Sequence, residues 1–327
     1  MNYLKTFLPY LFGNKKGKSL EVSIPEIIPW DSLNFEEILM FHALRNSLDS
    51  YLHSIDLTII GKKDLFQLFN FLPFLNVDLR FQFECTFKEE YKYFLEATQA
   101  SVLNKNELQE LLNFKNNKLT LFAILDKKRS RPGLLIIRKA NGYFLKNDLS
   151  NIWSIPVLGL SGRGLPFHHT NGQTPTGVFT LDSVMPEANN PYEFGKFRRL
   201  IVNFIPKSLD ESDLTALLPS NHQNKSWWKA SVVARELGRS LLRIHGTGRS
   251  NLNPFSSYFP FVPTSGCLAT KEGHLLGLKR YNDQRLLLDS LQKAMNLPVF
   301  FENESKIHGL LYVVEFDDNL SALHFVI

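Results

Sequence analysis

The sequence predicts an α+β fold, with a mainly helical N-terminal domain followed by a β-rich domain. Before residue 113, apolar residues recur mostly at helical spacing, whereas after Asn116 short apolar runs alternate with polar, Gly and Pro turns. The length of 327 residues suffices for two ordinary domains. The boundary is expected near residues 113–118, which gives domains of residues 1–115 and 116–327.

The N-terminal helices are expected from capping signals and periodicity. Asn34 followed by Glu37 is typical of a capped helix start, and apolar residues then recur to Ile55. Further helices are expected over residues 63–71, 89–100 and 106–113. Residues 79–87 alternate strictly between apolar and polar side chains, which predicts a half-buried strand with Cys85 among phenylalanines on its apolar face. Cys85 is therefore interpreted as a small core residue.

The β-rich domain is expected to combine short strands with one long helix. The helix should follow Cys267, with Leu286, Leu287, Leu291 and Met295 as its apolar stripe. Strands are expected over residues 119–125, 133–138, 155–160, 177–181, 200–204, 240–245, 310–316 and 322–326.

Composition limits the possible function classes. The chain has 44% hydrophobic and 21% charged residues, which is typical of a globular protein. The net charge of +5 comes from scattered basic residues, so no nucleic-acid partner is expected. Two cysteines exclude a disulfide-rich scaffold, and a single bridge between Cys85 and Cys267 is disfavoured but left open.

The first residues do not have the order of a secretory signal. Lys5 interrupts a short apolar stretch over residues 3–13, and Lys15, Lys16 and Lys18 follow it rather than precede it. No apolar run approaches the ~20 residues that cross a bilayer. Localisation therefore stays open, with this segment favouring the cytoplasm.

The stretch from Ile244 to Thr270 carries the residues best suited to catalysis. A thiol is mostly protonated near neutral pH, so a nucleophilic Cys267 needs a base, and His245 has a suitable proton affinity. Gly266 permits a tight turn that can aim successive N–H groups at an oxyanion. The alternative is a buried cysteine after a glycine turn and a histidine at a strand end, and this local reasoning leaves both open.

Two motifs stand out along the chain. The first is Thr174-Pro175-Thr176-Gly177-Val178-Phe179, and the second, further along, is His245-Gly246-Thr247 followed by Thr264-Ser265-Gly266-Cys267. In this order they resemble the signature of the L,D-transpeptidases, which act on peptidoglycan stem peptides, and the first motif resembles the T-P-x-G-x-F segment of that family. The resemblance covers roughly residues 119–316 and implies a β-rich L,D-transpeptidase-like catalytic domain.

The resemblance also implies roles for individual residues. Cys267 would attack the carbonyl of the L-centre at the third stem residue, and His245 would take the thiol proton. Backbone N–H groups of Gly266 and Cys267 would bind the oxyanion. The expected partner is a peptidoglycan or muropeptide stem peptide, with no cofactor and no metal. Residues expected to shape the turn or bind substrate are Thr264, Ser265, Gly246, Thr247 and Arg249.

The chain differs from the family pattern near the nucleophile. Ser265 stands where His is common, and Ala269 stands where Arg or Asn is common. Arg249 is proposed as a replacement cation. The resemblance implies an L,D-transpeptidase or an L,D-carboxypeptidase, and exported location would accompany the former. The alternative is a catalytically silent relative that binds peptidoglycan or a partner protein. A papain-like hydrolase is disfavoured because His precedes Cys.

Other polar and aromatic clusters favour structural roles. His168 and His169 are adjacent, so on a strand they would face opposite ways and are poor co-ligands for one metal. A loop position is expected for them, with lining of the cleft as the alternative. Trp227 and Trp228 are expected to pack beneath the following helix.

Overall fold

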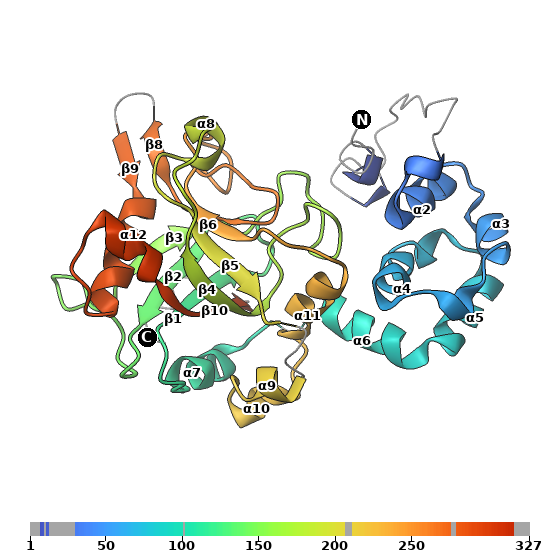
Figure 1. Cartoon of the computed structure of the whole chain (residues 1–327), viewed down its shortest axis with the longest axis horizontal. Helices are drawn as coiled ribbons and strands as arrows, with labels where there is room; N and C mark the ends of the chain where they lie inside the picture. The colour runs from blue at the N-terminus through green and yellow to red at the C-terminus, as the bar shows by residue number, and fades with distance from the viewer. Residues whose placement is uncertain are drawn as a thin grey trace.

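The computed structural model describes residues 7–9, 11–12, 30–100, 102–206, 211–275 and 279–316. The fold is α+β, as expected, with a helical region at one end and a sheet at the other (Figure 1). The helical region contains η1 (Trp30–Ser32), α2 (Phe35–Leu44), α3 (Leu48–His53), η2 (Leu57–Ile59), α4 (Lys62–Phe69), η3 (Leu72–Phe74), α5 (Val77–Thr86) and α6 (Lys88–Thr98).

The described strands form one eight-stranded mixed sheet and a separate hairpin. The order in the sheet is β3 (Ser154–Val157), β2 (Gly133–Arg138), β1 (Thr120–Asp126), β10 (His308–Phe316), β4 (Gly177–Val184), β5 (Leu200–Phe204), β6 (Arg243–His245) and β7 (Leu268–Ala269). The β1–β10 and β6–β7 pairs are parallel and the other pairs are antiparallel. The hairpin joins β8 (Glu272–Leu275) to β9 (Lys279–Asn282).

Helices cover both faces of the sheet. One face packs against α12 (Asp283–Ala294), whose Leu287 and Leu291 are buried in the same cluster as Leu200 and Ile244. The other face packs against α7 (Lys105–Asn113) and Trp227 and Trp228, which precede α11 (Lys229–Glu236). The remaining helical segments are α8 (Pro191–Phe194), α9 (Glu211–Thr215), α10 (Ser220–Gln223) and η4 (Phe301–Lys306).

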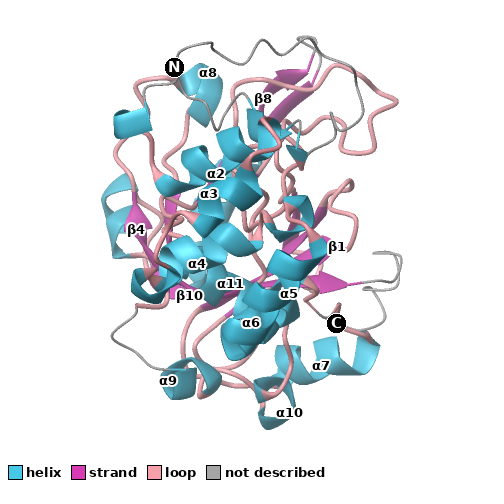
Figure 2. Cartoon of the chain, turned by 90° about the vertical axis from the view of Figure 1, so that its right-hand side faces the viewer, coloured by secondary structure: helices cyan, strands magenta, loops and turns pink. Residues whose placement is uncertain are grey.

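Helix α11 belongs to two cores at once. Its Val232 lies in the cluster on the sheet, while Ala230, Val233 and Ala234 lie in the cluster formed by the helical region. Figure 2 shows α11 beside α4 and α6, seen from the helical end. The expected boundary at residues 113–118 falls between α7 and β1, and α7 itself packs on the sheet through Leu108 and its neighbours.

Several local expectations are confirmed. Asn34 accepts a hydrogen bond from the Glu37 N–H at 3.0 Å, and the Glu37 carboxylate accepts one from the Asn34 N–H at 3.2 Å, so the capping box exists. The helix ends earlier than expected, because Asn46 adopts a left-handed conformation with φ 55° between α2 and α3. Trp227 and Trp228 are buried as expected. The strand expected over residues 322–326 lies outside the described residues.

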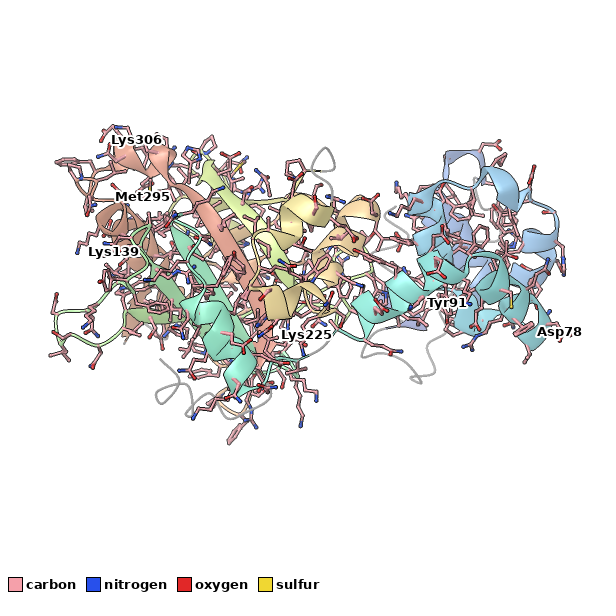
Figure 3. All side chains as sticks on the ribbon, turned by 90° about the horizontal axis from the view of Figure 1, so that it is seen from below. Asp78, Tyr91, Lys139, Lys225, Met295 and Lys306 are labelled. Atoms are coloured by element: carbon pink, nitrogen blue, oxygen red, sulfur yellow. The ribbon has the colours of Figure 1, made fainter. Side chains whose placement is uncertain are left out.

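The strand predicted over residues 79–87 is wrong. This segment is α5, and Asn76 caps it by accepting a hydrogen bond from the Leu79 N–H at 2.8 Å. Leu79 and Phe83, four residues apart, face the core, while Phe81 is 66% exposed. Cys85 is exposed rather than buried, and both cysteines are free. Figure 3 shows this helical region, with Asp78 and Tyr91 labelled, at the end away from Lys306.

In the described part of the chain, no helix combines the length and the apolar composition that crossing a membrane requires.

Candidate active site

His245 ends strand β6 at the edge of the sheet, and Cys267 directly precedes the neighbouring parallel strand β7. The register of β6 with β7 pairs Ile244 with Leu268 and His245 with Ala269. Ile244 and Leu268 are both buried in the cluster beneath α12. Because side chains alternate along a strand, His245 faces away from that cluster. The parallel pairing therefore brings the end of β6 next to the segment that begins at Cys267.

Gly266 occupies a position that only glycine fits. Its φ is +112°, a conformation that L side chains rarely adopt. A Cβ here would overlap the guanidinium of Arg239 and lie 2.9 Å from the carbonyl oxygen of Gly172. The turn before Cys267 therefore requires glycine, both for its positive φ and because no side chain fits there.

Threonine hydroxyls from the two motifs hold the peptide groups of this turn. Thr174 Oγ1 donates to the Gly266 carbonyl at 2.9 Å, and Thr264 Oγ1 donates to the Cys267 carbonyl at 2.6 Å. In a trans peptide the N–H points away from the preceding C=O, so the first bond also directs the Cys267 N–H away from Thr174. The T-P-T-G motif and the Gly-Cys motif therefore form one structural unit.

The rest of the T-P-T-G motif anchors this unit to α11. Thr176 Oγ1 donates to the carbonyl of Trp227 at 2.6 Å. Gly177 has φ +142°, and a Cβ there would overlap the Ser231 side chain. Both contacts require close approach between the start of β4 and α11, which explains a small residue at this position.

The imidazole of His245 is held in one tautomer. Its Nδ1 lies 2.6 Å from the carbonyl oxygen of Gly246, and a carbonyl can only accept, so Nδ1 carries the proton and Nε2 carries a lone pair. Burial lowers the pKa of His245, and Arg199 and Arg243 add to this effect against the opposing Gly246 hydrogen bond. The histidine is therefore a neutral base at rest.

Glu272 supports the backbone behind His245. A Cβ added at Gly246 or at Gly195 would overlap the Glu272 carboxyl group. The absence of a side chain at these two glycines therefore leaves the space that the carboxyl group occupies. Glu272 Oε1 accepts hydrogen bonds from the N–H groups of Lys196 and Phe197, while burial raises the pKa of its carboxyl group. This buried acid therefore packs directly against Gly246, the residue whose carbonyl orients the imidazole.

Residue Cys267 is partly exposed, and the charges of three arginines act on its thiol. Its Sγ lies 3.8 Å from the carbonyl oxygen of Leu241, a residue with φ +60°. Burial raises the pKa of the thiol, while the N–H of Arg243 and the positive charges of Arg243, Arg239 and Arg199 oppose this rise. The structure contains no hydrogen bond between Cys267 and His245, both of which are described. The raised pKa of the thiol and the lowered pKa of the imidazole both favour the uncharged forms, so both groups are neutral at rest.

Of the other residues predicted for the site, Thr264 and Ser265 belong to this turn, whereas Thr247 and Arg249 line a separate hollow with Thr270 and Glu272. Ser265 is exposed, and Thr247 Oγ1 donates to the Arg249 carbonyl at 2.9 Å. The guanidinium of Arg249 forms an ion pair with Glu193 at 2.6 Å and is not among the cations that act on the thiol. Ala269 is buried against Leu158 and Phe261.

His168 and His169 lie in the loop between β3 and β4, against the helical region. His168 Nδ1 lies 2.6 Å from Asn70 Oδ1, and the His169 ring stacks near Phe12 at 4.1 Å between centroids. Burial lowers the pKa of both histidines, that of His169 to about 3. Among the described side chains, no group of three His, Cys, Asp or Glu residues is placed to hold a metal ion.

Sequence reasoning missed the arginines and a buried glutamine. Arg243 stands two residues before His245, so strand alternation could have placed both on one face, whereas Arg199 and Arg239 come from separate segments. Gln284 on α12 donates to the carbonyls of Arg198 at 2.9 Å and Ile244 at 3.1 Å, and its Oε1 accepts from Thr270 at 2.9 Å. Gln284 thus connects the start of β5, strand β6 and the residue after β7 through hydrogen bonds.

No family model and no curated protein sequence matches the chain. A solved structure of the Bd1075 protein from Bdellovibrio bacteriovorus aligns with 64% of the chain at 11% sequence identity and a TM-score of 0.29. The chain spans about half of that protein's length, 53%. A similarity of this size carries no inference about fold or function.

Proposed function

We propose that this protein is a cysteine-dependent acyl transferase or peptidase that acts on peptidoglycan stem peptides, as an L,D-transpeptidase or an L,D-carboxypeptidase. One observation carries the proposal: β6, which ends at His245, pairs with β7, which directly follows Cys267, and the T-P-T-G motif is hydrogen-bonded to the turn before Cys267. The two motifs that resemble the family are far apart in sequence, and a bond between them supports a common role.

The chemistry follows from the protonation states. As the Sγ of Cys267 forms a bond to the substrate carbonyl carbon, its proton passes to the free Nε2 of His245. The Cys267 N–H donates to the resulting oxyanion. Collapse breaks the C–N bond, and His245 returns the proton to the leaving amine. A water molecule or an amine of another stem then attacks the thioester, which gives trimming or cross-linking.

The neutral resting pair has a kinetic consequence. Because burial raises the pKa of the thiol and lowers that of His245, little thiolate exists before substrate binds. His245 must then take the thiol proton during the reaction, either before or together with attack. The arginines near Sγ stabilise negative charge as it develops.

A muramyl tetrapeptide assay tests the proposal. The purified protein is incubated with the peptide, and products and intact protein mass are followed by mass spectrometry. Loss of the terminal D-Ala and a thioester adduct are expected, both abolished in Cys267→Ala and retained in the matched control Cys85→Ala. Addition of an acceptor stem separates cross-linking from trimming. An unchanged peptide with an unmodified protein would refute the enzyme.

One set of observations favours a catalytically silent binding protein instead. The thiol pKa is raised, no hydrogen bond joins Cys267 to His245, and buried Ala269 replaces a polar residue common in the family. For this alternative, the tetrapeptide would bind without turnover, and Cys267→Ala would bind it equally well. Isothermal titration of both proteins with the peptide distinguishes the two functions.

A further inference from the structure

Three arginines contribute positive charge at Cys267, and none of them has an acidic partner among the described residues. Arg239, Arg243 and Arg199 all act on its thiol, and within the described residues no Asp or Glu forms an ion pair with any of them. Such uncompensated positive charge at a partly exposed nucleophile attracts an anion. The three arginines differ, however, in how many of their donors are already used.

Arg239 is a structural residue. Its NH1 donates to the carbonyls of Phe167 at 2.6 Å and Gln173 at 2.8 Å, and its NH2 donates to that of Gly172 at 3.0 Å. The side chain is also packed beneath Gly266. It therefore holds the loop that supports the nucleophile turn, and a ligand cannot readily reach it.

Arg199 and Arg243 retain free donors. Arg243 uses NH1 for the carbonyl of Leu242 at 2.5 Å. Arg199 makes no side-chain hydrogen bond to the described residues, and its buried Nε has no partner. Its guanidinium stacks on the Phe194 ring at 4.7 Å, and the same ring lies 5.9 Å from the His245 ring. Because a buried N–H without an acceptor is costly and the rest of the side chain is partly exposed, a ligand that enters from solvent is the natural partner.

Arg199 and Arg243 lie beside His245 at the edge of the sheet. In the antiparallel β5–β6 pair, Leu200 is opposite Ile244 and Ile201 is opposite Arg243, and Arg199 immediately precedes β5. Leu200 and Ile244 point beneath α12. Alternation then places Arg199 and Arg243 on the face that carries His245.

We propose that Arg199 and Arg243 form a carboxylate subsite that binds the free C-terminal carboxylate of the residue released from the peptide. The inference rests on the proposed function. In a peptide the carboxylate of the last residue lies within about 4 Å of the scissile carbonyl carbon, so both fit one small recess. Paired N–H donors of a guanidinium match a carboxylate bidentately. The subsite thus selects the last peptide bond of a stem. It also supplies the polar contact that the Arg or Asn common in the family would make at the position of Ala269.

Alkylation of Cys267 tests the subsite without any peptide. Sγ displaces iodide from iodoacetate, an anion, or from iodoacetamide, its neutral analogue, and rates are measured on a Cys85→Ala background. Arg199→Gln and Arg243→Gln should each lower the iodoacetate-to-iodoacetamide rate ratio about tenfold, and Arg199→Lys should restore much of it. The matched control Lys306→Gln, an exposed residue at the far end (Figure 3), should keep the ratio. An equal fall in both rates would show that the arginines act on the thiolate alone and would overturn the proposal.

A peptide assay then tests the specificity. The wild-type protein should lose about a hundredfold in kcat/KM when the terminal carboxylate is replaced by a carboxamide. The Arg199→Gln variant should lose about as much kcat/KM with the carboxylate peptide, and little further kcat/KM when the carboxamide peptide is used instead. Equal wild-type turnover of acid and amide would refute the subsite. No turnover of either peptide, with the alkylation ratio as expected, would refute the proposed function and leave an anion site beside Cys267. Circular dichroism checks that each variant is folded.

Discussion

Burial of His169 should make the contact between the helical region and the loop that joins β3 to β4 sensitive to acid. The ring is 1% exposed, and its Nδ1 lies 4.0 Å from Glu36 Oε1. Burial, with a smaller effect of Arg239, lowers the pKa of His169 from 6.5 to about 3. Between these two values the unfolded chain binds a proton at this residue that the folded chain does not. Folding stability must therefore fall as the pH drops below 6.5.

The loss of folding stability depends on how far the pH lies below 6.5, the pKa of an unperturbed histidine. Each pH unit below 6.5 costs about 1.4 kcal/mol for one such histidine. His168 shifts in the same direction, while the raised pKa of buried Glu36 acts in the opposite one. Both remain in a His169→Phe variant, whose ring can keep the stacking on Phe12, so the comparison with wild type isolates His169.

Urea unfolding at pH 7.5 and at pH 5.5 measures the effect. The stability of His169→Phe relative to wild type should improve by about 1.4 kcal/mol between the two pH values. The exposed residue His53, changed to Phe, is the matched control and should show no such improvement. A relative stability of His169→Phe that is the same at both pH values would refute the account of a buried neutral histidine.

Four further predictions concern the site. Because the pKa of His245 is lowered, its basic form persists in acid, so the acidic limb of the kcat/KM profile should lie below pH 6.5, and a limb above that value would contradict the tautomer and burial described above. Gly266→Ala should lower the free energy of unfolding by about 2 kcal/mol, measured in urea, because φ is +112° and Arg239 must move. Thr174→Val should reduce kcat about tenfold with little change in KM, since the hydroxyl holds the Gly266 carbonyl and no substrate atom; a change in KM alone would indicate substrate contact. Gln284→Leu should destabilise the protein by about 3 kcal/mol, seen as a lower thermal midpoint, because buried carbonyls of Arg198 and Ile244 lose their donor.

The sequence predicted best those features that depend on local chemistry. The Asn34 cap, the strand at Gly177 and the glycine before Cys267 each follow from residue types within a few positions of one another. A strand ending at His245 was also expected, whereas the short strand β7 that follows Cys267 was not.

Features that depend on tertiary packing could not be predicted in the same way. The alternation around Cys85 matched a strand, but the cap at Asn76 and the contacts of Leu79 and Phe83 favoured a helix. Arg199 and Arg239 lie far from Cys267 along the chain, and only the strand order and the loop before β4 bring them to it. The spacing of these arginines along the sequence therefore could not predict that they lie near Cys267.

Helix α11 limits how this protein could change over evolutionary time. It is buried on both sides, and the T-P-T-G motif is attached to it through Trp227 and Ser231. A recombination event that removed residues 1–100 or exchanged them for another module would uncover Ala230, Val233 and Ala234. Any replacement would have to supply a matching apolar surface and new partners for the loop carrying His168 and His169. The helical region and the sheet are therefore expected to be inherited, and to vary, as one unit.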